Sequence, residues 1–307
     1  MASLEVSVVG LGCNNFGKRI DAAATTAVVD AALESGIDHF DTADLYANGR
    51  SEELLGRALG ARRKDVVVAT KFGHPASVFG KGAKPAHVRR ALEGSLRRLG
   101  TDYVDLYWIH KPDPETPIAD TLGALDDLVR QGKVREIGCS NFDVEQLRDA
   151  ERAVRPGGAR FVALQNEYSL LHREPEDGVL DECDRLGVGL VPYFPLASGL
   201  LTGKYRKGRP LPEGTRISEG SGYAKLLTGR NLDVVEELVR FAESRGHTIL
   251  DLAFAWLLAH RAVTSVIAGA TKPEQVRANA AAARWRLTDA ERAEVDAITA
   301  DVGTSAA

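Results

Sequence analysis

Short apolar segments alternate with amphipathic segments along the whole chain. The apolar segments are rich in branched residues, and most are apolar nearly throughout, which predicts strands covered by other elements on both faces. These predicted strands span residues 7–12, 37–43, 66–71, 103–110, 136–141, 161–167, 188–195 and 264–270. The predicted helices between them include residues 22–34, 52–59, 86–99, 118–130 and 144–153. This alternation predicts an α/β protein.

The segment 86–99 shows the helical pattern well. Val88, Leu92 and Leu96 recur at helical spacing and form an apolar stripe, while charged residues occupy the opposite side. Gly100 follows directly, and glycine is a common helix stop because it accepts a left-handed backbone.

Eight strands that alternate with helices fit a closed (β/α)8 TIM barrel, whose active site lies at the C-terminal rim. A doubly wound open sheet has the same alternation, so periodicity alone does not distinguish the two. The count of eight, and polar residues after several different strands, favour the barrel. No composition break marks a second domain, so we expect one domain over residues 1–307. The segment 204–231 is rich in Gly, Pro, Ser and charge, and it predicts a long rim loop.

Composition narrows the functional classes. The chain has 307 residues, 44% of them apolar, and a net charge of −4, which argues against a nucleic-acid binder. Cys13, Cys139 and Cys183 have neither metal-ligand spacing nor an even number, which suits a reducing compartment, and no metal site is predicted. The N-terminus does not resemble a signal peptide, and no apolar run reaches the ~20 residues that cross a bilayer. We therefore expect a cytoplasmic protein with no membrane partner.

Two short motifs are misleading. The segment 10–17 looks like a dinucleotide-binding glycine loop, but Asn15 stands where the third glycine belongs and no helix opens there. Tyr107 and Lys111 match the Tyr-x-x-x-Lys pair of short-chain dehydrogenases, which place it on a helix. Here the surrounding residues predict a strand, in which the two side chains stand about 13 Å apart.

Four polar residues have a different significance. Asp41, Lys71 and His110 each close a predicted strand, and Tyr46 follows Asp41 in the same loop. A carbonyl reductase must protonate the developing alkoxide, and a neighbouring cation lowers the pKa of a tyrosine, which is ordinarily about 10. Lys71 is the candidate cation, Asp41 its partner, and His110 a donor that orients the carbonyl. Each residue alone has an ordinary structural explanation, but the four together indicate a proton-donating site.

Longer motifs around these residues resemble the aldo-keto reductases. The segments 41–56, 96–110 and 132–142 are similar to that family's first signature, its catalytic-histidine segment and its fifth strand. By this resemblance, the catalytic residues are Asp41, Tyr46, Lys71 and His110, with Tyr46 as the acid in carbonyl reduction.

The resemblance also implies cofactor contacts. Ser140, Asn141 and Gln165 match positions that hold the nicotinamide carboxamide, although turn chemistry explains them equally. Tyr193 matches the aromatic residue that stacks on the nicotinamide. The loop along the pyrophosphate is represented by Pro195, Leu196, Ala197, Gly199, Leu201 and Lys204, joined by Arg216. The adenosine end is represented by Gly269, Thr271, Gln275 and Asn279, where a helix N-terminus can hold a phosphate.

The chain departs from the family at three places. Ala278 stands where many members have a glutamate that faces adenine, and Thr271 stands where several have a cation beside the 2′-phosphate. Lys272 can compensate, so NADPH is favoured over NADH. The family usually begins with a hairpin that plugs the barrel floor, and only one of its strands is expected here.

The sequence therefore predicts an NADPH-dependent reductase of aldehydes or ketones. The alternative is a non-catalytic, nucleotide-binding subunit of the same fold that senses redox state. Substrate choice depends on the loops 74–84, 111–116 and 205–228, and Trp108 is more simply explained by core packing than by substrate contact. The substrate, the direction of the reaction and the oligomeric state are not determined by the sequence.

Overall fold

The computed structural model describes residues 4–218 and 221–300. Over these residues, eight parallel strands form one curled sheet in the order β7-β6-β5-β4-β3-β2-β1-β8. The strands are β1 Val9–Gly12, β2 His39–Asp41, β3 Val67–Phe72, β4 Val104–Ile109, β5 Val134–Ser140, β6 Phe161–Gln165, β7 Gly189–Leu190 and β8 Val266–Gly269. The sheet closes where Leu190 N donates to Ala262 O (2.7 Å) and Leu190 O accepts from Thr264 N (2.9 Å). This closure confirms the (β/α)8 barrel against the open sheet.

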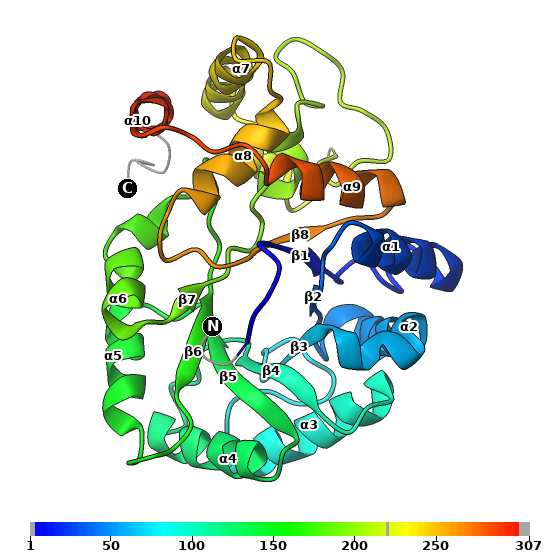
Figure 1. Ribbon diagram of the computed structural model, residues 1–307, viewed down its shortest axis with the longest axis vertical. Helices are drawn as coiled ribbons and strands as arrows, with labels where there is room; N and C mark the ends of the chain where they lie inside the picture. Colours follow the sequence, from blue (N-terminus) through cyan, green and yellow to red (C-terminus); the bar gives the residue numbers. More distant parts are fainter. Residues whose placement is uncertain (1–3, 219–220, 301–307) are drawn as a thin grey trace.

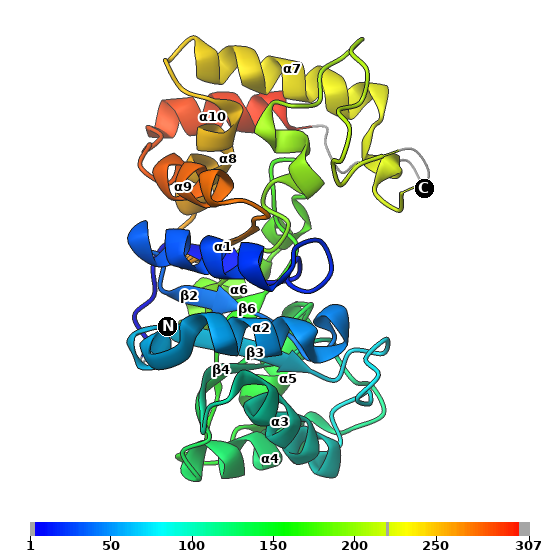
Figure 2. The same ribbon diagram turned by 90° about the vertical axis from the view of Figure 1, so that its right-hand side faces the viewer.

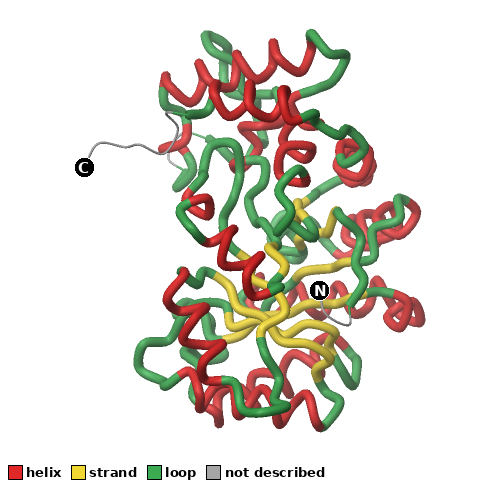
Figure 3. Tube along the Cα trace, turned by 60° about the vertical axis from the view of Figure 1, so that its left-hand side comes forward, coloured by secondary structure: helices red, strands yellow, loops and turns green. Residues whose placement is uncertain are grey.

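Helices surround the strands, as Figures 1 and 3 show. They are α1 Ala22–Glu34, α2 Arg50–Leu59, α3 Pro85–Leu99, α4 Ile118–Arg130, α5 Val144–Ala153, α6 Val179–Leu186, α7 Gly229–Glu243, α8 Ile249–Leu258, α9 Pro273–Ala282 and α10 Asp289–Ile298. Helices α1, α4 and α5 begin and end where the sequence predicts. Gly100 ends α3 with a left-handed backbone (φ 66°), as predicted.

Alternate residues of the strands point into the barrel, and they are packed tightly there. Leu106 and Trp108 of β4 belong to an interior cluster together with Val67 and Ala69 of β3. The indole of Trp108 is fully buried, and Gly138 leaves room for it, because a Cβ there would come within 2.5 Å of the ring. Trp108 is therefore a core residue, as the sequence suggested.

The N-terminal segment fills the barrel floor without forming a strand. Leu4 is 2% exposed, and Leu4 and Val6 pack against the interior cluster. Residues 4–7 have no strand hydrogen bonding, so the expected single hairpin strand is not formed in the described residues. Figure 1 shows this segment inside the ring of strands. The floor is thus lined by one buried and one partly buried apolar side chain from this segment.

The long rim loop is present but contains some local structure. The short helix η5, Ala224–Leu226, lies within it, and α7 begins at Gly229 inside the predicted loop 204–231. Residues 219 and 220 of this loop lie outside the described residues. Figure 2 shows α7 and α10 side by side at one end of the molecule. The interpretation of residues 1–307 as one domain stays a prediction.

In the described residues, none of the helices combines the length and apolar character needed to cross a bilayer.

Candidate functional site

The strand register brings three of the four predicted catalytic residues to one rim. Asp41 ends β2, Lys71 lies next to the end of β3, and His110 directly follows β4. Lys71 continues the inward-facing positions of β3, and His110 continues those of β4, so both side chains face the barrel axis. Tyr46 begins the short helix η1, Tyr46–Gly49, in the loop after β2.

These side chains form one buried network. The Lys71 ammonium is fully buried and donates to the Asp41 carboxylate and to Thr42 O (2.9 Å). It also lies 3.4 Å from the hydroxyl of Tyr46. Gln165 Nε2 donates to the second oxygen of Asp41 at 3.1 Å. Each carboxylate oxygen therefore has a donor, which a buried ion pair requires.

A strained turn holds Tyr46 in place. Ala47 and Asn48 have left-handed backbones, with φ of 48° and 53°. Such conformations cost about 1–3 kcal/mol and persist where the surrounding structure enforces them. The Tyr46 ring stands edge-on to His110, with centroids 6.1 Å apart and an interplanar angle of 86°.

Burial, not the neighbouring cation, dominates the acidity of Tyr46. Burial raises the pKa of Tyr46, and the Lys71 charge opposes this shift without reversing it. The expectation of a net lowered pKa is therefore wrong for this structure, because desolvation of a phenolate outweighs one cation that is already paired. Burial also opposes the charge of Lys71, but Asp41 and Tyr46 together raise the pKa of Lys71, so it stays a cation.

His110 is a neutral imidazole. Burial, followed by the charge of Lys71, lowers the pKa of His110 well below its usual value. Its Nδ1 atom is buried and has no hydrogen-bond partner among the described residues. At neutral pH this ring is a hydrogen-bond donor to a substrate oxygen and not a source of protons.

The residues predicted to hold the nicotinamide lie directly beside this network. Tyr193 OH donates to Asn141 Oδ1 (2.8 Å), and Asn141 Nδ2 donates to His110 O (3.0 Å). Ser140 Oγ donates to Gln165 O at 2.7 Å. Asn141 has a left-handed backbone (φ 63°), which turns its amide back toward His110. The structure thus joins Ser140, Asn141, Gln165 and Tyr193 to the four rim residues.

Three cations gather farther along the rim. Arg216, with Arg19 and Lys204, forms a cluster in which burial and mutual repulsion lower the pKa of Lys204 and Arg216. No carboxylate of the described residues pairs with any of the three. Arg216 instead donates to Asn15 Oδ1 (2.9 Å), and Asn15 Nδ2 donates to Ala270 O (3.1 Å). Unpaired cations held together in this way suit a polyanion.

The loop after β7 approaches this cluster through its backbone. It contains the short helix η4, Ala197–Thr202, in which Ala197, Ser198 and Gly199 have left-handed backbones. A Cβ at Gly199 would come 2.8 Å from Lys204 Nζ, so glycine permits the approach. Ser198 Oγ is buried without a partner among the described residues. The other residues of this loop that the resemblance assigns to cofactor contact are Pro195, Leu196 and Leu201.

One residue of that loop faces away from any ligand. The Leu201 side chain is fully buried in the hydrophobic core, so only its backbone is available for contact.

Strand β7 is much shorter than the predicted 188–195. Val191 N still bonds Leu164 O (2.8 Å) and Tyr193 N bonds Asn166 O (3.0 Å), but Pro192 has no N–H to continue the ladder.

The predicted adenosine end is the beginning of α9. Thr271 N and its hydroxyl both donate to Gln275 Oε1, at 2.8 and 3.1 Å. Asn279 is buried on the same helix, and Gly269 is exposed, with Asn15 Nδ2 3.2 Å from where its Cβ would lie. Thr271 follows Ala270, which connects this end to the cation cluster through Asn15.

Sequence reasoning missed three residues of this site, namely Arg19, Asn15 and Ser198. Asn15 was noted only because it breaks a glycine motif, yet it links Arg216 to the loop after β8. The glycine motif itself is not a phosphate loop, because α1 begins only at Ala22. Likewise Tyr107 lies in β4 with its hydroxyl on Val88 O (3.4 Å), so the Tyr-x-x-x-Lys interpretation is rejected as predicted.

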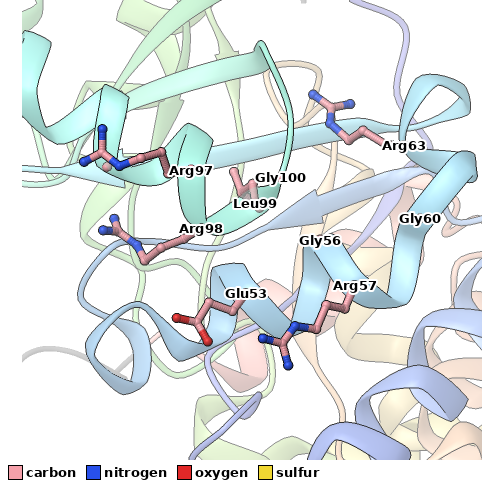
Figure 4. Close-up of a pocket in the computed structure, with 10 residues that line it drawn as sticks. Glu53, Gly56, Arg57, Gly60, Arg63, Arg97, Arg98, Leu99 and Gly100 are labelled. Atoms are coloured by element: carbon pink, nitrogen blue, oxygen red, sulfur yellow. The ribbon is translucent and has the colours of Figure 1, made fainter.

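A hollow of about 590 Å³ lies elsewhere, between the C-terminal ends of α2 and α3. Its arginines include Arg57, Arg63, Arg97 and Arg98, whose guanidinium groups are set apart from one another in Figure 4. Arg63 and Arg98 are already in ion pairs. Basic residues at helix C-termini are expected from the helix dipole, and these ends lie away from the C-terminal rim. We assign no ligand to this hollow.

The chain is similar to known proteins over nearly its whole length. The sequence model of the Aldo/keto reductase family matches residues 8–300. A probable voltage-gated potassium channel subunit beta from Oryza sativa subsp. japonica is 37% identical over 289 residues, which is 91% of this chain and 88% of that protein. The NADP(+) aldo-keto reductase of Schizosaccharomyces pombe is 34% identical over 303 residues, which is 94% of this chain and 87% of that protein. Among solved structures, the glycerol dehydrogenase of Gluconobacter oxydans has a TM-score of 0.85 at 31% identity. The match covers 99% of this chain and 95% of that chain.

Proposed function

The chain belongs to the aldo/keto reductase family, and from this premise we propose that it is an NADPH-dependent reductase of aldehydes and ketones that also oxidises the alcohols. Members such as glycerol dehydrogenase are oxidoreductases that act on CH–OH or carbonyl groups. The observation that carries the proposal is the Tyr46 hydroxyl, 3.4 Å from the buried Lys71 ammonium and beside the neutral His110 ring.

The proposed chemistry divides the work among these side chains. His110 donates a hydrogen bond to the carbonyl oxygen and orients it, and its neutrality keeps it a donor across the physiological pH range. Tyr46 gives its proton to the same oxygen as charge develops there. Lys71 stabilises the phenolate that remains, and Asp41 keeps the lysine charged. A bound dinucleotide supplies the hydride that reaches the carbonyl carbon.

The surrounding residues fit a phosphorylated dinucleotide. The cations Arg19, Lys204 and Arg216, which have no carboxylate partner in the described part of the chain, suit its pyrophosphate. The Ser198 hydroxyl, which has no partner there either, lies in the same loop region. Lys272 is exposed at the start of α9, where it supplies positive charge for a 2′-phosphate. This favours NADPH over NADH, and the relative from Schizosaccharomyces pombe carries NADP(+) in its name.

The second candidate is a nucleotide-binding subunit that senses redox state without turnover. The rice relative named as a channel subunit motivates it. A panel of aliphatic and aromatic aldehydes and ketones with NADPH separates the two: cofactor binding with no NADPH oxidation for any compound would favour the sensor. The hydrogen-bonded set of Asp41, Lys71 and Tyr46, with the His110 ring edge-on to Tyr46, supports the enzyme.

The direct test is Tyr46→Phe. We expect kcat/KM for carbonyl reduction to fall about 10²–10⁴-fold, because the proton donor is lost, while NADPH affinity stays within a few-fold. The matched control is Tyr103→Phe, a tyrosine at the opposite end of β4 that stacks on Arg63. A Tyr46→Phe enzyme with wild-type rates would refute the assignment of the donor.

The cytoplasmic location of the protein stays a prediction.

A further inference from the structure

The left-handed turn that follows Tyr46 is packed against two side chains from the next βα unit of the chain. Gly49, which ends this turn with φ of 83°, is buried. A Cβ at Gly49 would lie 2.6 Å from Arg98 Cδ, 2.8 Å from Arg98 Nε and 3.2 Å from the ring of Phe79. Arg98 belongs to α3, and Phe79 belongs to the loop between β3 and α3. Only a glycine lets these side chains come so close to the backbone of the turn.

The Arg98 side chain is held by several contacts at once. Its Nε donates to the fully buried carboxylate of Glu52 at 2.6 Å. Its Nη2 donates to Ser95 Oγ at 3.3 Å, and its guanidinium carbon lies 4.1 Å from the centre of the Phe79 ring. Gly94, one turn earlier in α3, leaves space for the guanidinium, because a Cβ there would lie 3.0 Å from Arg98 Nη1. An arginine fixed in this way is a rigid support for the turn.

Glu52 connects this support to the strand that carries the catalytic lysine. Its second carboxylate oxygen accepts from Thr70 Oγ1 at 2.6 Å, and Thr70 directly precedes Lys71 in β3. Glu52 lies in the first turn of α2, where the helix dipole favours a negative charge. Lys71 and Tyr46, whose polar atoms are 3.4 Å apart, are thus both held relative to the same buried carboxylate, the tyrosine through Arg98.

We propose that Arg98 is a positioning residue for Tyr46. Held by Glu52 and covered by Phe79, Arg98 keeps the left-handed turn closed and so holds the tyrosine hydroxyl beside the catalytic lysine. Left-handed conformations of residues other than glycine persist where the surrounding structure enforces them, and Arg98 and Phe79 supply that enforcement here. The catalytic consequence rests on the proposed function: a proton donor misplaced by about 1 Å loses much of its effect, because the reacting atoms must be aligned.

Two variants test this role without removing the charge that pairs with Glu52. Arg98→Lys keeps the cation but loses the planar group that lies on the Phe79 ring, and Phe79→Ala removes the ring and keeps the ion pair. For each, with the aldehyde that the wild type reduces fastest, we expect kcat to fall about tenfold, while Kd for NADPH stays within about twofold. Arg97→Lys, at the exposed neighbour in α3, and Val78→Ala, at a 65% exposed neighbour in the same loop, are the matched controls and should keep wild-type kcat.

A double-mutant cycle with Tyr46→Phe separates positioning from a general loss of structure. If Arg98 and Phe79 act through Tyr46, then Arg98→Lys and Phe79→Ala should each change the residual kcat of Tyr46→Phe by less than about twofold. An equal loss of kcat in the wild-type and Tyr46→Phe backgrounds would overturn the proposal, because the effect would not pass through the tyrosine. If Tyr46→Phe itself keeps wild-type rates, the proposed proton donor is wrong, and that result is separate from the cycle.

Amide hydrogen exchange tests the support without any turnover. The amides of Tyr46, Asn48 and Arg50 are hydrogen-bonded within the turn. We expect them to exchange about tenfold faster in Arg98→Lys and in Phe79→Ala than in the wild type, while the amides of α5 exchange as before. Unchanged exchange at the turn would overturn the proposal even if kcat fell. Faster exchange in a protein that reduces no carbonyl compound would uphold the positioning of Tyr46 and refute only the proposed reductase.

Discussion

At the scale of single residues, the buried carboxylate of Asp44 has an unusual titration. Burial, and then the neighbouring Glu52 carboxylate, raises the pKa of Asp44 from 3.8 to about 6. The folded protein therefore holds this proton more tightly than the unfolded chain does. The free energy of unfolding falls as pH rises between about 4 and 6, and the full penalty remains above that range.

We predict that Asp44→Asn raises the free energy of unfolding at pH 8 by about 1–3 kcal/mol, because the buried charge is removed. The gain should shrink as pH falls through 6 and vanish near pH 4, where the wild-type carboxyl is protonated in both states. Urea denaturation at pH 8 and pH 4.5 measures it. Asp65→Asn, at an exposed aspartate, is the control. A loss of stability at pH 8 would mean that the charge is compensated.

At the scale of elements, the contact between α2 and α3 depends on a missing side chain. A Cβ at Gly56 would lie 2.0 Å from Leu99 O, so the two helices touch backbone to backbone there. Alanine is the better helix former, and propensity alone would favour the substitution by about 1 kcal/mol. The clash acts in the opposite direction and is with rigid backbone, so the packing decides.

Gly56→Ala is therefore expected to destabilise the protein by about 1–3 kcal/mol, because α2 must move away from α3. Gly229→Ala at the start of α7 is the matched control, since nothing lies within 4 Å of its Cβ position, and it should be neutral or slightly stabilising. Denaturant midpoints for both variants decide the matter. Equal stability of Gly56→Ala and wild type would show that these helices separate at no cost.

At the scale of the whole molecule, the proposed cofactor site joins segments that are distant in sequence. Arg216 of the rim loop meets Asn15 after β1, and Asn15 meets Ala270 after β8. A dinucleotide bound along this line would tie the rim loop to the C-terminal ends of β1 and β8, the first and last strands of the barrel. Because such a ligand binds only the folded state, saturation at 100 times Kd stabilises the protein by about 2.7 kcal/mol.

We predict that NADP+ raises the melting temperature by on the order of 5 °C, and that Arg216→Met loses most of this shift at the same concentration. The variant removes the charge without removing the fold, since Arg216 has no carboxylate partner among the described residues. Thermal melts with and without NADP+ provide the comparison. Arg209→Met, at an exposed arginine of the same loop, should keep the full shift. An unchanged shift in Arg216→Met would place the cofactor elsewhere.

The sequence alone predicted the alternation of strands and helices and the polar residues at the strand ends. The closed barrel was favoured by the count of eight strands and confirmed by the closure at Leu190. Strand and helix periodicity depends on neighbouring residues, which is why α1, α4 and α5 were predicted to their ends. The residues that close β2, β3 and β4 could be chosen in the same way, because parallel strands deliver their C-terminal residues to one edge. Polar residues at those positions were visible without any structure.

Only the tertiary structure decided what depends on burial and on distant contacts. The pKa of Tyr46 could not be predicted, because desolvation and the Lys71 charge act in opposite directions and their balance depends on packing. The role of Asn15 could not be predicted either, since it depends on partners from other βα units. Local patterns specify which element a residue joins. The chemistry of a side chain also depends on what the fold places around it.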